Sequence, residues 1–115
     1  MSNYNLIEVK EMADGDEDFM KVVVQTFLEE IPPDVQAMNE AISNDNPTLA
    51  YQYAHKMKPN LQLFGLDLMD QIQVIEDWAK EGRKKKNVSE AGSKIRKKVS
   101  VAEIALKRDF ELDES

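Results

Sequence analysis

Residues 87–110, NVSEAGSKIRKKVSVAEIALKRDF, carry the most regular pattern in the chain. Apolar residues recur there at steps of three and four, at Val88, Ala91, Ile95, Val99, Ala102, Leu106 and Phe110. This spacing forms one continuous apolar stripe on an α-helix, which has 3.6 residues per turn. The stretch therefore predicts a long amphipathic helix that packs against other elements along one side.

A second apolar stripe predicts a long helix over residues 17–44. Asp16 is a fair N-cap for it. The stripe consists of Phe19, Met20, Val23, Val24, Phe27, Leu28 and Ile31. Pro32 and Pro33 interrupt it, because proline lacks an N–H and crowds the preceding turn. The stripe resumes at the same phase after the two prolines, at Val35, Met38 and Ile42. We therefore expect a kinked or briefly broken helix and not a hairpin turn. The acidic residues between the apolar ones, including Asp34, are expected on a solvated face.

Three further helices follow from local signals. A short first helix is predicted over 4–13, with an apolar side formed by Leu6, Val9 and Met12. Asn46 as a cap and Pro47 at the first helical position predict a third helix over 47–64, which Gly65 ends or bends. A fourth helix is expected from residue 66 or 67 to residue 81, with Gly82 as a left-handed stop.

These patterns predict an all-α fold, because no period-two strand pattern is present. The expected architecture is an antiparallel four-helix bundle with a short N-terminal capping helix. We assign residues 1–110 to a single domain and expect residues 111–115 to be an acidic, disordered tail.

Composition excludes several classes of function. The 115 residues include no cysteine, which excludes disulfides, thiolate zinc sites, iron–sulfur clusters and a cysteine nucleophile. No apolar run approaches the roughly 18 residues of a membrane span, and the N-terminus lacks a signal-peptide layout. No phosphate-binding loop, serine-nucleophile motif or metal-ligand spacing is present. We therefore expect a cytoplasmic protein that binds no metal or cofactor.

Charge is distributed unevenly along the chain. The net charge of −7 divides into −11 over residues 1–82, +8 over 83–108 and −4 over 109–115. The favoured interpretation is a bundle with two oppositely charged faces. A basic surface for an acidic partner, a phosphate or a lipid is the alternative.

The helix over 47–64 contains the single histidine of the chain, His55. Ala50, Tyr53, Ala54, Met57, Leu61 and Phe64 cluster on its core side. At 100° per residue, His55 lies about 150° from the centre of that side. We therefore expect an exposed imidazole, which is a nucleophile at neutral pH and can accept a phosphoryl group. Lys58 lies three residues further on the same face, where its charge can counter the incoming phosphate. Pro59 cannot bond the His55 carbonyl, so a kink is expected there.

Residues 54–66, AHKMKPNLQLFGL, resemble the signature of histidine-containing phosphotransfer (HPt) domains, Ala-His-x-x-Lys-Gly with a second Gly ten residues after the His. His55, Lys58 and Gly65 match it by residue and offset. Ile75 and Glu76 resemble the Leu-Glu pair of the family's following helix. Pro59 departs from the signature, which usually has Gly there. With the surrounding helix pattern, the resemblance covers about residues 4–110.

The resemblance implies a relay in a multistep two-component pathway. His55 would accept a phosphoryl group on Nε2 from the aspartyl phosphate of one receiver domain and pass it to another, with Lys58 stabilising the group. The receiver would supply Mg²⁺, and the chain itself would be a phosphoryl carrier with no catalytic activity of its own. The implied docking surface consists of Tyr51, Gln52, Pro59, Gln62 and Gly65. The implied partners are response-regulator receiver domains and a hybrid sensor kinase, bound by a monomer.

Two other interpretations stay open. The chain could be a non-catalytic pseudo-HPt or adaptor bundle that binds a receiver or kinase without phosphotransfer. Alternatively, the basic segment from Arg83 to Arg108 could bind a nucleic acid or an anionic membrane. The first interpretation differs from a relay only in that His55 is never phosphorylated.

Overall fold

The computed structural model describes residues 4–82 and 86–112, and all regular elements in these ranges are helices. There are five of them, in the order α1 Ile7–Ala13, α2 Glu17–Ser43, α3 Pro47–Leu63, α4 Met69–Glu81 and α5 Lys86–Asp109. The sequence-based expectation of an all-α fold is confirmed. No helix in the described ranges has the length and apolar content needed to cross a membrane.

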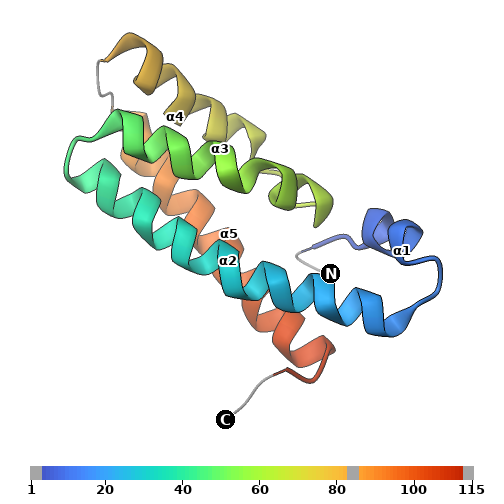
Figure 1. Cartoon of the computed structure of the whole chain (residues 1–115). Helices are drawn as coiled ribbons and strands as arrows, with labels where there is room; N and C mark the ends of the chain where they lie inside the picture. Colours follow the sequence, from blue (N-terminus) through green and yellow to red (C-terminus); the bar gives the residue numbers. More distant parts are fainter. Residues whose placement is uncertain (1–3, 83–85, 113–115) are drawn as a thin grey trace.

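The four longer helices pack side by side and run in alternating directions (Figure 1). The pairs in contact are α2 with α3 and α5, and α4 with α3 and α5. Helix α1 packs on the first part of α2 and lies beyond the end of α3 (Figure 1). One apolar core joins the helices, and its largest members include Phe27, Phe64, Met38, Met57, Leu61 and Ile95.

Three helix ends lie where capping residues in the sequence predict them, at Asp16, Asn46 and Gly82. The Asp16 side chain accepts a hydrogen bond from the Phe19 N–H at 3.1 Å, and the Asn46 side chain accepts one from the Leu49 N–H at 3.1 Å. Gly82 ends α4 with a left-handed φ of 71°. These contacts satisfy backbone groups that a helix end leaves unpaired, which is why short-range sequence signals locate them.

Several sequence-based boundaries need correction. Helix α2 is continuous through Pro32 and Pro33, which agrees with the absence of a hairpin turn and excludes the brief break that was the alternative to a kink. Helix α4 begins only at Met69, because Leu66 and Leu68 are both buried and a tight turn joins them. The first helix begins at Ile7 and not at residue 4. Of the predicted tail over 111–115, residues 113–115 lie outside the described part of the chain.

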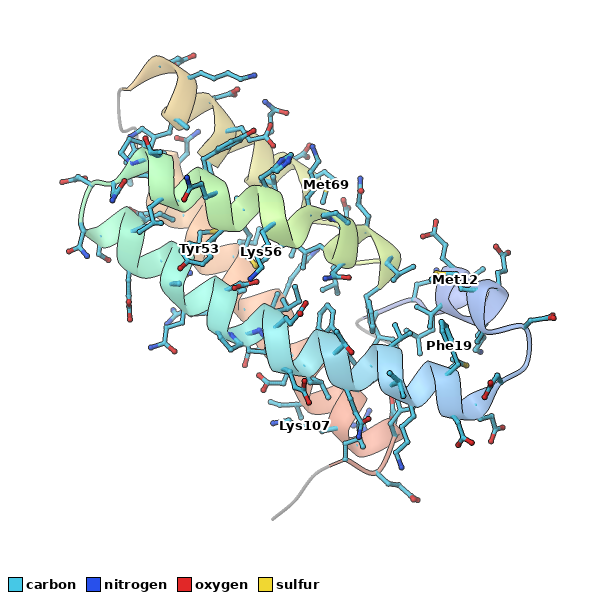
Figure 2. The ribbon with its side chains drawn as sticks, viewed as in Figure 1. Met12, Phe19, Tyr53, Lys56, Met69 and Lys107 are labelled. Carbon is cyan, nitrogen blue, oxygen red and sulfur yellow. The ribbon has the colours of Figure 1, made fainter. Side chains whose placement is uncertain are left out.

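Two apolar residues assigned to buried stripes are exposed, Met12 to 58% and Phe19 to 39% (Figure 2). In α1 the inward positions are taken by Val9 and Ala13, which leaves Met12 on the outer side. Phe19 lies in the first turn of α2 and points away from the core there. A stripe predicts which side of a helix is apolar, but not how far along the helix its neighbours extend.

Two hydrogen bonds hold the segment before α1 against the helices α3 and α5. The Asn5 N–H donates to the Phe64 carbonyl at 2.7 Å, at the end of α3. The Tyr4 hydroxyl donates to the Asp109 carboxylate at the end of α5. Partial burial and this hydrogen bond raise the pKa of Tyr4 to about 12. The protonated phenol is therefore favoured in the folded state.

This contact predicts an alkaline loss of stability. A Tyr pKa that rises from 10 to about 12 on folding stabilises the protein below pH 10, and this contribution disappears as the pH rises from 10 to 12. Because the ring is partly exposed, we expect a loss on the order of 1 kcal/mol in the free energy of unfolding. Urea unfolding at several pH values should show this loss in the wild type and not in Tyr4→Phe. Tyr53→Phe is the control that retains the loss. An equal loss in Tyr4→Phe would assign it to other groups.

Candidate functional site

Helix α3 presents His55 to solvent, as the sequence predicts. The opposite side of the helix is anchored in the core by Ala50, Ala54, Met57 and Leu61, all of them fully buried. His55 follows Ala54 directly and is exposed. Because consecutive residues of a helix point about 100° apart, burial of this apolar face fixes the direction of the imidazole. Helix α3 continues through Pro59 to Leu63 without a break.

An aromatic neighbour covers one side of the imidazole. The rings of Tyr51 and His55 are stacked, with centroids 5.6 Å apart and an interplanar angle of 25°. The two residues are one turn apart on the same helix face, where side chains at i and i+4 meet. Tyr51 was assigned to the docking surface, and its ring contact with His55 limits the orientations that the imidazole can adopt.

Lys58 forms an ion pair with the neighbouring helix. Its Nζ lies 3.7 Å from Oε1 of Glu76 on α4. The Lys58 side chain is 37% exposed, whereas that of Glu76 is only 12% exposed. The ammonium group that the sequence assigns to the phosphoryl site therefore contacts a carboxylate of α4 in this structure. The ion-pair role of Glu76 could not be read from the sequence, because it depends on how α4 packs against α3.

A second ion pair flanks His55 on the other side. Lys56 extends between α3 and α2, where its Nζ lies 3.3 Å from Oδ1 of Asp34 (Figure 2). Asp34 is only 7% exposed, and its Oδ2 has no hydrogen-bond partner among the described residues. The expectation that Asp34 lies on a solvated face is wrong. Asp34 faces α3, because α2 packs against α3 as well as against α5.

Three of the assigned docking residues lie near His55 on the outer surface of α3. Gln52, Pro59 and Gln62 are all exposed, at positions three, four and seven residues from His55. Such spacings keep side chains on or close to one helix face. Their exposure leaves this side of α3 open to solvent.

Gly65 has a structural role at the end of α3. Its φ is +69°, and a Cβ on this residue would lie 2.4 Å from Cβ of Asn5. Glycine therefore permits both the left-handed turn and the close approach of the segment that precedes α1. This packing accounts for Gly65 without any partner.

No cluster of three or more His, Asp or Glu side chains in residues 4–82 and 86–112 could hold a metal ion. The site thus consists of a stacked, exposed imidazole between two ion pairs that join α3 to α2 and α4. Comparisons of the chain with models of known families, with curated proteins and with solved structures found no significant match.

Proposed function

We propose that the chain is a histidine phosphotransfer protein of a multistep two-component phosphorelay. The observation that carries this proposal is His55, the single histidine of the chain, exposed in the middle of α3 and followed by Lys58. His55, Lys58 and Gly65 have the residue types and offsets of the HPt signature. In this role the protein is a phosphoryl carrier that acts in the cytoplasm.

The helix arrangement supports this proposal. We interpret α2 to α5 as an antiparallel four-helix bundle and α1 as its short N-terminal cap. An imidazole on the outer side of such a bundle is accessible to a large partner. A carrier needs this access, because the receiver domain supplies Mg²⁺ and the acidic pocket for the reaction.

The proposed transfer uses few groups of this chain. The imidazole nitrogen bonds to phosphorus as the bond between phosphorus and the receiver's aspartyl oxygen breaks, which leaves a free carboxylate on the receiver. Lys58 then has two anions within reach, the phosphoryl group and Glu76. A doubly charged phosphoryl group competes well with one carboxylate for an ammonium group. Lys58 thus stabilises the phosphorylated state and returns to Glu76 after transfer.

A transfer assay tests the proposal. Purified protein is mixed with a panel of receiver domains carrying ³²P-aspartyl phosphate and Mg²⁺, taken from the same source. We expect label to move to this chain, to be labile in acid and stable in base, and to map to the peptide that contains His55. Binding to a receiver without label would instead indicate the adaptor alternative. If no receiver of the complete panel transfers label to the chain or binds it, both the relay and the adaptor hypothesis are refuted.

A further inference from the structure

Helix α5 extends well beyond α4 at the end of the molecule where α1 lies. The Lys98 ammonium group donates to the Asp67 carbonyl at 3.1 Å, just before α4 begins. From this point α5 continues to Asp109, a distance of roughly 16 Å at 1.5 Å per residue. Helix α1 packs on α2, so it does not replace α4 as a neighbour of this part of α5. The segment from Tyr4 to Ile7 lies beside this part of α5 instead, and a groove remains between them.

A groove of about 940 Å³ lies at this position. From α5 it is lined by Lys97, Lys98 and Val101, and at its end by Asp109 and Phe110. The segment from Tyr4 to Ile7 forms its opposite side, and the Tyr4 hydroxyl reaches across to Asp109. Apolar side chains reach solvent here, with Ile7 61% and Val101 45% exposed. A partly buried methionine, Met20, also lines the groove. Exposed apolar side chains that gather in one groove are typical of an interaction site.

Charge in the groove is opposite to that of the chain as a whole. Three lysines line it, Lys10, Lys97 and Lys98. No ion pair involving Lys10 or Lys97 is found among the described residues. Two aspartates, Asp67 and Asp109, also line the groove, and the Nε of Arg108 lies 3.1 Å from Oδ1 of Asp109. The groove therefore favours an anionic occupant although the net charge of the protein is −7.

We propose that this groove binds an acidic amphipathic helix of a partner protein. The exposed Val101 and the lysines Lys97 and Lys98 lie within about 6 Å along α5, so one turn of such a helix can contact all three. The apolar side of such a helix covers Ile7 and Val101, and its acidic flanks meet the lysines. The groove lies at one end of the molecule, whereas His55 lies in the middle of α3. The proposal therefore does not depend on phosphotransfer.

The test uses a fluorescein-labelled 14-residue peptide with leucines at helical spacing on one side and glutamates on the flanks. Fluorescence anisotropy measures its affinity for the full chain, and ¹⁵N NMR maps the contact. We expect binding that weakens as salt increases, with shifts centred on Ile7, Lys97 and Val101. A peptide with lysine in place of glutamate is expected to bind at least about tenfold more weakly.

Matched variants on α5 locate the site. Lys97→Glu should weaken peptide binding by about tenfold, whereas Lys94→Glu, outside the groove, should change it less than about twofold. Val101→Ser should likewise weaken binding, whereas Ile104→Ser should not, although Ile104 is 64% exposed and lies on the same helix. All four positions are exposed, so folding is expected to be retained.

Three results would overturn the proposal. The first is no peptide binding at millimolar concentration. The second is a peptide affinity that neither Lys97→Glu nor Val101→Ser changes. The third is self-association of the chain, measured by analytical ultracentrifugation, that these two substitutions abolish, because a second copy would then be the occupant. Dodecyl phosphate is tested in parallel, and its binding at the groove without that of the peptide would identify a small amphiphile instead.

Discussion

Replacement of His55 by Gln is expected to abolish phosphoryl transfer to this chain, a loss of about a hundredfold or more in the labelling rate. Glutamine retains a polar side chain of similar size but has no nucleophilic nitrogen. The chain has no other histidine that could take over. The measurement is transfer from a phosphorylated receiver, followed by gel autoradiography over time.

The fold is expected to be unaffected, because the His55 side chain is exposed and contributes little to the core. Circular dichroism and urea unfolding of His55→Gln check this point. Lys94→Gln is the matched surface control on α5, and it should accept the phosphoryl group at the wild-type rate. Acid-labile label on His55→Gln at the wild-type rate would contradict the assignment of His55.

Replacement of Phe64 by Ala should produce the largest loss of stability among the substitutions considered. Phe64 is 1% exposed, and its ring lies 4.2 Å from that of Phe27, centroid to centroid. A buried Phe replaced by Ala costs about 3–5 kcal/mol, since a cavity remains. The Phe64 backbone also joins α3 to Asn5, so the end of the molecule near α1 should loosen first. We expect Tm to fall by roughly 15 °C.

Phe19→Ala is the control for this prediction, because it makes the same chemical change at a residue that is 39% exposed. It should cost less than about 1 kcal/mol in the free energy of unfolding. Phe64→Leu, which retains most of the volume, keeps the comparison measurable if Phe64→Ala does not fold. Equal losses for Phe64→Ala and Phe19→Ala would show that the aromatic pair is not central to the core.

Features that depend on a few neighbouring residues could be predicted from the sequence. The caps at Asp16 and Asn46 and the stop at Gly82 need only local hydrogen bonds or a local backbone conformation. The exposure of His55 could also be predicted from a local pattern, because burial of the apolar side of α3 leaves residues on the opposite side exposed. The continuity of α2 through two prolines was not predictable in this way, because packing on both sides supports that helix.

Contacts between helices escaped prediction. Asp34 has the sequence environment of a solvated acid, and only the packing of α2 against α3 buries it next to Lys56. The contact of Lys58 with Glu76 likewise depends on the rotation of α4 relative to α3. The sequence predicted a cation three residues after the histidine, but it could not show which carboxylate that cation contacts.

The two ion pairs beside His55 bear on how partners bind. Lys56 contacts α2 and Lys58 contacts α4, so both lysines next to His55 in the sequence already have partners within the protein. A partner that docks there orders few side chains of this chain, which keeps the entropic cost of association low. In the proposed phosphorelay, each receiver domain would meet lysines that are already paired beside the histidine.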